Sequence, residues 1–410
     1  MRRRAWIVLA AALVALAATV TGATARTAAD PGITNDSILI GGTFPLSGSA
    51  SLYGAIPVAE KAYFDYVNDT RGGVNGRKIN FKYVDDGYDA SQTVPAIRQL
   101  VEQDKVFAIV NALGTAPGLA VRDYLNERKV PQVLLATGDS FWGFQYKKYP
   151  WTIGYNPSYP GEGTIFAKHI LSKTPQAKVG VLMQNDPFGQ QLLAGLRRGF
   201  APNSKSRIVD VEPVDVTAPD VSQQLLKLKA SGADTLIIFT TPSPSIKAFV
   251  TAAKINWHPQ IYVSYVSASP LFMGAIAKAA GAAAVDGTIT TSYVKDATNP
   301  GEQNDPGVKL FEQIMAKYYP KGNIADANLI YAMSVAWTAV NALQRAGKTP
   351  TRQGFMNALT STNTAANPFL LKGVRLQTSK TDHFFIEDLT LTKWANGHWN
   401  AFGSFYHHAR

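Results

Sequence analysis

The sequence contains no cysteine in 410 residues. A disulfide, a thiolate metal site and a cysteine nucleophile are therefore excluded, and so is the lipid-attachment site of a bacterial lipoprotein signal. Stability has to come from hydrophobic cores, and apolar residues make up 46% of the chain, which is a normal globular share. At about 150 residues per domain, this length predicts two domains and leaves three open.

Long apolar runs are also scarce, because only the first 25 residues contain one. Arginines occupy positions 2 to 4, residues 6–20 are almost continuously apolar, and residues 23–25 read Ala-Thr-Ala, a small-x-small cleavage site. This order is typical of a secretory signal peptide. The alternative is an uncleaved anchor helix, but a core of about 15 residues is shorter than the roughly 20 that span a bilayer. We therefore predict cleavage near Ala25 and export of a soluble chain, periplasmic or secreted, with no lipid anchor.

Blocks of charge are absent after residue 25, although the chain is basic overall. The formal net charge is +11, and the three N-terminal arginines account for three of these charges, which leaves +8 for the rest. The remaining lysines and arginines occur singly or in short pairs such as Lys147 and Lys148, and no basic run reaches five residues. Proteins that bind nucleic acid or anionic membranes gather such charges into patches. We expect an ordinary basic surface and no nucleic-acid partner.

Strand-like and helix-like segments alternate through two successive runs of the chain. The first run has strand-like segments at 37–42, 78–85, 106–110 and 130–135, and helix-like segments at 53–68, 91–103 and 116–128. The second run has strand-like segments at 178–184, 207–211, 234–240 and 260–264, and helix-like segments at 160–172, 189–200, 221–231 and 245–254. Alternation at this spacing favours parallel sheets with helices on both faces. We predict two α/β lobes in tandem, without a visible sequence repeat.

The C-terminal part follows a different order. Amphipathic helices are predicted over 308–319, 328–346 and 352–359, and strand-like alternation over 371–376, 383–393 and 398–405. Residues 395–397 read Ala-Asn-Gly, a hairpin turn between the last two strands. Helices followed by strands suggest that the chain revisits both lobes. After a signal peptide at 1–25, we place lobe 1 at residues 30–151 plus 292–365 and lobe 2 at residues 152–291 plus 366–410.

A ligand site is expected beyond the carboxyl ends of the strands, where open α/β sheets bind their ligands. The loops at these ends, rich in small hydroxyl residues, glycine and aromatics, span residues 43–54, 111–117, 136–142, 185–189, 240–244 and 265–267. A cleft built from them would stack rings on a ligand and donate neutral hydrogen bonds. Thr115 opens a helix whose free amides attract an anion, with a plain capping hydroxyl as the alternative. Tyr53, Trp142 and Phe188 could contact the ligand or could equally pack within the lobes.

Several short motifs, taken together, resemble one family. Residues 40–48 (IGGTFPLSG) resemble the opening of type I periplasmic binding proteins of the branched-chain amino acid transport group. Residues 72–77 (GGVNGR) resemble that group's glycine-rich turn, and the acids of 85–89 and the NDPFG sequence of 185–189 also fit. Each motif alone is weak, but the set in this order behind a signal peptide is strong. The resemblance extends over residues 37–405.

The resemblance implies a fold and a function. Its members have two Rossmann-like lobes joined by a three-stranded hinge, with a ligand cleft between the lobes that closes by hinge motion. They are extracytoplasmic substrate-binding proteins of ABC importers. The chain is accordingly expected to be a monomer that binds a small molecule, such as an amino acid, an organic or aromatic acid or an amide. Its partner would be an ABC permease complex in the membrane.

The resemblance also implies where the ligand lies. In leucine-binding relatives, hydroxyls and backbone amides of the loop that matches residues 112–116 hold the ligand carboxylate. Aromatics that match Tyr53 and Phe188 cover the ligand from the two lobes, and the segment that matches residues 136–138 adds polar contacts. With loop residues of both lobes included, the candidate ligand-binding residues are Tyr53, Leu113, Gly114, Thr115, Ala136, Thr137, Trp142, Phe188, Thr241 and Val266.

One departure from the family pattern concerns the charge of the ligand. Amino-acid binders usually place a Glu or Asp after the strand that matches residues 260–264, where it pairs with the ligand ammonium. Here residues 265–269 read YVSAS, around Val266, and contain no acid. Burying an ammonium without a carboxylate partner is costly. We therefore expect a neutral or purely anionic ligand to bind better than a zwitterionic amino acid.

Sequence motifs for catalysis and for metal binding are missing. The chain has no G-x-S-x-G elbow, no G-x-x-x-x-G-K-[ST] phosphate loop, and no H-E-x-x-H or histidine pair at zinc spacing. Residues 85–89 superficially resemble a calcium loop but lack the glutamate at its twelfth position. We expect no enzymatic activity, no catalytic residue, no metal and no cofactor. A ligand sensor with the same fold is the alternative to a transport protein.

Overall fold

The computed structural model describes residues 29–407 and residue 410. Its contacts divide the chain into Met1–Asp30 and Pro31–Arg410, and every element named below lies in the second unit. The signal peptide and the cleavage site that the sequence predicts lie outside the described residues. No helix in the described part of the chain is long and apolar enough to span a membrane.

Five parallel strands form the first sheet, in the order β2-β1-β3-β4-β5. They are β1 (Ser37–Phe44), β2 (Lys78–Asp85), β3 (Ile109–Val110), β4 (Gln132–Leu135) and β5 (Thr152–Gly154). The helical elements between them are η1 (Ser51–Tyr53), α2 (Ile56–Arg71), α3 (Ala90–Arg98), η2 (Gln99–Gln103), α4 (Thr115–Glu127) and α5 (Phe141–Phe144). We call this sheet and the helices packed on it the first lobe.

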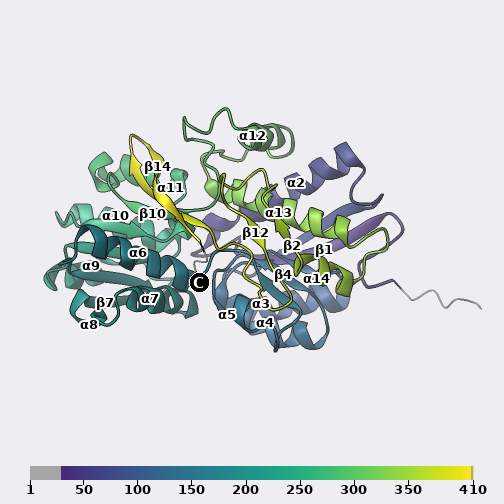
Figure 1. Cartoon of the computed structure of the whole chain (residues 1–410), viewed down its shortest axis with the longest axis horizontal. Helices are drawn as coiled ribbons and strands as arrows, with labels where there is room; N and C mark the ends of the chain where they lie inside the picture. Colours follow the sequence, from purple (N-terminus) through teal and green to yellow (C-terminus); the bar gives the residue numbers. More distant parts are fainter. Residues whose placement is uncertain (1–28, 408–409) are drawn as a thin grey trace, which may run out of the picture. The chain divides into compact units, whose positions relative to one another are not determined.

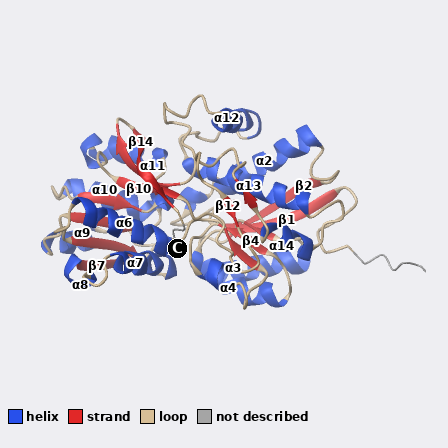
Figure 2. Ribbon diagram, viewed as in Figure 1, coloured by secondary structure: helices blue, strands red, loops and turns tan. Residues whose placement is uncertain are grey.

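Seven strands form the second sheet, in the order β14-β13-β10-β9-β8-β6-β7. The parallel part comprises β6 (Val179–Gln184), β7 (Ile208–Val214), β8 (Thr235–Phe239), β9 (Gln260–Val263) and β10 (Ile289–Ser292). Its helical elements are α6 (Tyr159–Lys173), α7 (Pro187–Gly199), α8 (Ser204–Arg207), α9 (Ser222–Ala230), α10 (Pro242–Lys254), η3 (Tyr265–Ser267), α11 (Pro270–Ala280) and η4 (Ala282–Ala284). This second sheet with its helices is the second lobe, and Figure 2 shows helices flanking the strands of both lobes.

The burial of the strands and the helix caps explain this local structure. β6 and β8 are buried at every residue, as expected of parallel strands with helices on both faces. Helices begin at polar caps: Asp186 accepts a hydrogen bond from the Gly189 amide at α7 (3.1 Å), and Ser158 accepts one from the Gly161 amide at α6 (3.3 Å). These caps fix where each helix starts, next to the loops that the sequence proposes for ligand binding.

The C-terminal part returns to both lobes, as its order of elements predicts. Three helices join the first lobe, and the first two of them pack against α2: α12 (Pro306–Tyr318), α13 (Ala327–Arg345) and α14 (Arg352–Leu359). The short antiparallel pair of β11 (Asn363–Thr364) and β12 (Leu376–Gln377) follows. The hairpin of β13 (Leu389–Ala395) and β14 (His398–Tyr406), yellow in Figure 1, then pairs with β10. Its turn has Asn396 at φ 56° and Gly397 at φ 80°, as a type I′ turn requires.

Within the described residues, the chain crosses between the lobes three times, at residues 155–158, 293–305 and 378–388. The predicted two-lobed α/β class is therefore confirmed. Two elements lie on the other side of the boundaries that the sequence suggests. β5 follows residue 151 but pairs with β4 in the first sheet, and β12 follows residue 365 but pairs with β11, next to α14.

A few short elements differ from the sequence pattern. β5 and β10 have three and four residues, which is too few for an alternating hydrophobic pattern to be visible in the sequence. α11 is apolar along most of its length and therefore shows no helical periodicity. None of these three elements is predicted from the sequence. The strand expected over 383–393 begins only at Leu389, because the preceding residues form the third crossing. The strand expected over 371–376 is reduced to the two residues of β12.

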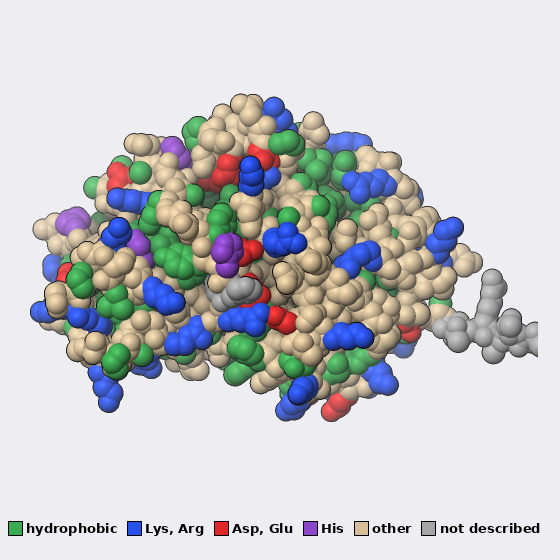
Figure 3. Space-filling view, viewed as in Figure 1, with side chains coloured by type: hydrophobic (Ala, Val, Ile, Leu, Met, Phe, Trp, Pro, Cys, Tyr) green, Lys and Arg blue, Asp and Glu red, His purple; other side chains and the backbone are tan. Residues whose placement is uncertain are grey.

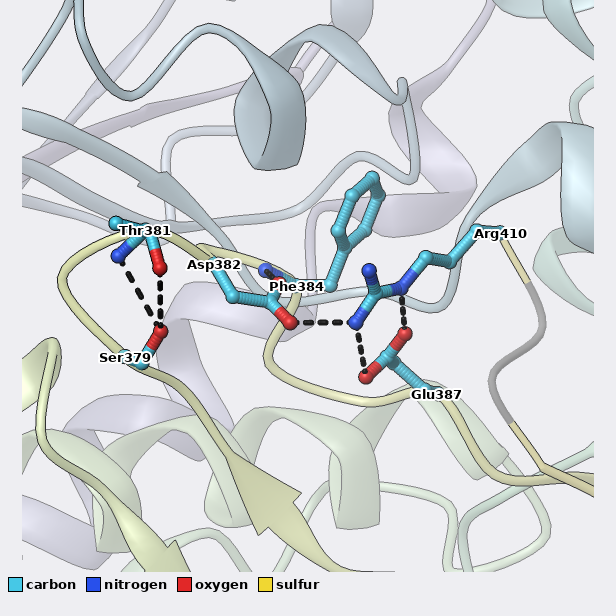
Figure 4. A network of polar contacts seen from close by, with 6 residues as sticks. All are labelled: Ser379, Thr381, Asp382, Phe384, Glu387 and Arg410. Carbon is cyan, nitrogen blue, oxygen red and sulfur yellow. Dashed lines mark hydrogen bonds and ion pairs between the residues drawn. The ribbon is translucent and has the colours of Figure 1, made fainter.

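Arg410 fastens the third crossing. Its guanidinium binds the carboxylates of Asp382 and Glu387 and lies over the ring of Phe384, 5.2 Å from the ring centroid (Figure 4). Phe384 packs edge-on against Phe144 of α5, with the ring centroids 4.8 Å apart. The third crossing is therefore tied to the first lobe on one side and to Arg410 on the other.

The basic side chains are dispersed over the surface. Figure 3 shows Lys and Arg side chains scattered singly over the visible face, interspersed with acidic and apolar groups. This distribution follows the scattered pattern of basic residues in the sequence.

Candidate ligand-binding cavity

A cavity of about 120 Å³ lies between the lobes, at the carboxyl ends of the strands. From the first lobe its wall includes Tyr53, Ile56, Tyr88, Leu113, Gly114, Ala136 and Tyr331. From the second lobe it includes Tyr159, Phe188, Thr241, Tyr265 and Val266, and the first and second crossings add Asn156 and Tyr293. An enclosed apolar cavity of roughly 150 Å³ holds benzene, so the space suits a small organic molecule.

Aromatic rings make up much of this wall. Tyr159 lies edge-on to Phe188 with ring centroids 4.9 Å apart, and it stacks on Tyr265 at 6.1 Å. Tyr265 meets Tyr293 edge-on at 5.4 Å. The second lobe and the second crossing therefore present one continuous aromatic surface, which would contact a flat or apolar ligand over a large area.

The tyrosine hydroxyls of the wall are neutral. Burial raises the pKa of each of them: Tyr53, Tyr88, Tyr159, Tyr265, Tyr293 and Tyr331. Three of these hydroxyls are fixed by the protein: that of Tyr265 donates to the Pro157 carbonyl (2.8 Å), that of Tyr331 donates to Asn111 Oδ1 (2.8 Å), and that of Tyr53 donates to the Val266 carbonyl. These rings thus offer an uncharged, largely preorganised surface.

Tyr53 links the two lobes across the cavity. It lies on η1 of the first lobe, and its hydroxyl donates to the backbone carbonyl of Val266 on η3 of the second lobe, at 3.0 Å. Both residues are among the candidates that the sequence suggests, and both line the cavity. The bond can exist only while the lobes are close together, so it reports their separation.

The N-terminus of α4 opens onto the cavity at Gly114. This residue has φ 110°, and a Cβ on it would lie 2.8 Å from the ring of Tyr88 and 3.0 Å from Pro117, so the position has no room for a side chain. The first amides of a helix have no intrahelical acceptor, and the helix dipole is positive there. This part of the wall therefore suits an anionic or polar head group.

Three of the candidate residues lie behind the wall instead of on it. Thr115 and Thr137 are buried, and their hydroxyls bond each other at 2.7 Å. Trp142 is enclosed in the core beside α4, 3.3 Å from the Cβ position of Gly118 and with the Arg122 guanidinium 4.6 Å from its ring centroid. Ligand contact by these three side chains was expected, but none of them lines the cavity, because their polar groups are used within the first lobe. The other seven candidates all line it.

A buried glutamate holds part of the second-lobe wall. Glu162 on α6 accepts hydrogen bonds from the Tyr265 amide (2.8 Å), the Ser264 hydroxyl (2.7 Å) and the Thr291 hydroxyl (2.8 Å). Burial raises its pKa to about 7, against the lowering effect of these three bonds. Glu162 thus joins α6, β9 and β10 directly behind Tyr265.

The second crossing brings acidic residues to the same cavity. Lys295, Asp296, Asn299 and Glu302 line it, next to Thr392 and Trp399 of the hairpin. Residues 265–269 do lack an acid, as the sequence shows, but carboxyl groups of Asp296 and Glu302 are present elsewhere on the cavity wall. The carboxyl groups come from a segment that the sequence pattern does not connect with the site. Among the described residues, no group of three or more His, Asp or Glu side chains could hold a metal ion.

Sequence reasoning missed much of the aromatic wall. Tyr88 could have been found, because it follows β2 at the carboxyl end of the strand. Tyr265 lies in a loop that the sequence does single out. Tyr159 directly follows the first crossing and Tyr293 begins the second, so only the positions of the crossings show that these rings face the cavity.

Comparisons with known proteins bear on this architecture. A family model described as a periplasmic binding protein matches residues 37–398. The Leu/Ile/Val-binding protein homolog 2 of Brucella abortus is 23% identical over 318 residues, which cover 76% of this chain and 79% of that protein.

Two solved structures show the same fold. A branched chain amino acid ABC transporter protein from Thermus thermophilus with bound valine has a TM-score of 0.78 and 19% identity, and the match covers 92% of this chain and 97% of that one. An ABC transporter solute binding protein from R. palustris in complex with benzoate has a TM-score of 0.74 and 16% identity, covering 90% and 96%. One holds a zwitterion and the other a simple anion, so the fold alone leaves the ligand of this chain open.

Proposed function

We propose that this chain, which belongs to the periplasmic binding protein family, is exported, captures a small organic molecule between its lobes and delivers it to the permease of an ABC importer. The observation that carries the proposal is the cavity at the carboxyl ends of both sheets. Its wall comes from the two lobes and from the segments that connect them. A ligand there would be enclosed only when the lobes are close together.

Capture by closure follows from where the wall residues lie. Tyr53 belongs to the first lobe, Phe188 and Val266 belong to the second, and three crossings join the lobes. Rotation about the crossings would break the bond from Tyr53 to Val266 and separate the two halves of the wall. A ligand that contacts both halves shifts the population towards the closed form by its differential affinity for that form.

The first lobe would hold the head of the ligand at Gly114 and the first amides of α4. With the Thr115 side chain behind the wall, backbone N–H groups would be the donors there, and the hydroxyl that we expected to contribute would support the loop through Thr137. The aromatic rings of both lobes would hold the flat or apolar remainder.

A screen of acids, amides and amino acids by thermal unfolding tests capture, because a ligand that binds only the folded state raises its stability. The gain is about 2.7 kcal/mol when the ligand is at 100 times its Kd. The Phe188→Ala variant should bind any ligand found more weakly, since it loses a ring of the wall, whereas Leu226→Ala, which removes an exposed side chain of α9 away from the cavity, serves as the control. Small-angle scattering should give a smaller radius of gyration with the ligand.

Cellular measurements test export and delivery. Intact-mass analysis of exported protein should find a chain without residues 1–25, and retention of Met1 would contradict cleavage. Cells without this protein should lose uptake of the ligand that the screen identifies. Uptake at the normal rate would contradict delivery to a permease even if binding is tight.

A further inference from the structure

The acidic side of the cavity has no role in holding an anion. Asp296 and Glu302 both line the cavity, and the Asp296 amide donates to Glu302 Oε2 at 3.1 Å. Asn299 fixes this part of the second crossing to the hairpin, because its side-chain amide donates to the Trp399 carbonyl at 3.1 Å. The two carboxyl groups are therefore held next to each other on a defined part of the wall.

Two oxygens on this side have no hydrogen-bond partner within the described part of the chain. One is Asp296 Oδ2 and the other is Thr392 Oγ1. Thr392 is only 4% exposed and lines the same cavity. The other oxygen of Asp296 is satisfied by Thr298, whose amide and hydroxyl donate at 2.8 and 2.6 Å. Buried oxygens without partners favour a ligand that brings its own donors.

The charges around the two carboxyl groups do not balance. The Lys295 ammonium binds Asp305 and donates to the Pro368 carbonyl at 2.7 Å, so it is already paired. His398, the first residue of β14, is half-buried, and its charge lowers the pKa of Asp296. Burial raises the pKa of Asp296, and it raises the pKa of Glu302 to about 7, with the charge of Asp296 adding to the shift. A cation from the ligand would relieve this excess of negative charge.

We propose that Asp296, Glu302 and Thr392 bind a primary ammonium or guanidinium group of the ligand. The unpartnered oxygens accept hydrogen bonds, so the cation must carry N–H donors, and a quaternary ammonium would not satisfy them. The inference deepens the proposed function, on which it rests, by naming the ligand class. The captured molecule carries a nitrogen cation for the second crossing and an anionic or polar head for α4, with a flat or apolar part between them.

Calorimetry with matched compounds tests this inference on the exported protein. The probes are 6-aminohexanoate and 4-(aminomethyl)benzoate, each compared with the acid that lacks nitrogen, hexanoate or 4-methylbenzoate, and with its N-trimethyl derivative. The primary amine of at least one set should bind about tenfold or more tightly than both its counterparts, as expected for hydrogen bonds to charged groups. An acid that binds as tightly as its amine in both sets would overturn the inference.

Variants of Asp296, Glu302 and Thr392 provide a second test of the inference. Asp296→Asn with Glu302→Gln should weaken the amine about tenfold and leave the nitrogen-free acid within about twofold. Thr392→Val should weaken the amine alone to a smaller extent. Glu312→Gln on α12 is the matched control, because Glu312 does not line the cavity, and it should change neither affinity. An amine affinity that is unaffected by the double variant would refute the assignment.

Proton release distinguishes binding of a cation by Asp296 and Glu302 from a merely structural role of these residues. A bound cation favours the ionised carboxylates, so near pH 6.5 the native protein should release protons when the amine binds, and the double variant should not. The release is measured from binding enthalpies in two buffers of different ionisation heat. If the nitrogen-free acids bind and the amines do not, the inference about the cation is wrong, but the proposed capture of a ligand stands. If no probe binds at millimolar concentration, the result counts against both.

Discussion

Replacing Glu162 by Gln should make the protein more stable at pH 8 and leave its stability at pH 4.5 nearly unchanged. The folded pKa of Glu162 is about 7, against 4.5 for an unperturbed glutamate. Between these two values the folded state binds the extra proton, so the contribution of Glu162 to stability is fully present below pH 4.5 and is lost as the pH rises to 7. The difference of about 2.5 units corresponds to roughly 3 kcal/mol. A glutamine with its oxygen in place of Oε1 keeps an acceptor for the Tyr265 amide and the Thr291 hydroxyl, and its NH2 group in place of Oε2 can donate to Ser264 Oγ.

Urea unfolding of the native and Glu162→Gln proteins at pH 4.5, 6 and 8 measures this effect. The free-energy difference between the two should grow with pH by up to about 1.4 kcal/mol per unit and then level off above pH 7. Other buried acids contribute to each profile, but they cancel in the difference, which isolates Glu162. A variant that is less stable than the native protein at pH 8 would refute the reasoning, because it would mean that the carboxylate is stabilised by its three donors.

Three further substitutions separate the roles of residues in and behind the wall. Tyr53→Phe removes the bond to Val266 and should weaken ligand binding about three- to tenfold by calorimetry; an unchanged affinity would mean that this bond does not favour closure. Gly114→Ala forces a Cβ against Tyr88 at a positive φ, so the melting temperature should fall by an amount equivalent to about 1–3 kcal/mol, and a normal melting temperature would contradict the described geometry. Trp142→Phe should lower stability by about 1–3 kcal/mol in urea and leave ligand affinity unchanged, whereas a selective loss of affinity would restore Trp142 to the site.

The lobes could be predicted because their signals are local. Buried strands, glycine turns and helix caps recur at regular spacing, and an apolar run such as β8 fixes an element without knowledge of its neighbours. Short elements such as β5 and β10 have no such signal, since their pairing partners alone define them. The boundaries of the lobes depend on these short strands, so they could not be placed to within a few residues.

The candidate site was predictable where a residue lies in the loop that follows a strand. Leu113, Ala136 and Thr241 meet this condition, and all three line the cavity. Whether a side chain faces the cavity or the core depends on packing between distant segments. This packing places the Trp142 side chain in the core of the first lobe. Asp296 could not be found for the same reason, because its segment is placed by contacts with residues 369–370 and with a hairpin about 100 residues later in the chain.

The second crossing both connects the lobes and lines the cavity, which affects how a biosensor could be built from this protein. A dye attached near residues 293–302 would respond both to a bound ligand and to rotation of the lobes. Its fluorescence change would therefore be large, but the dye would alter the affinity of the protein for the ligand. A dye pair on the outer helices, one on α3 and one on α9, would follow the rotation alone. The ratio of the two signals would separate ligand contact from lobe movement in a single titration.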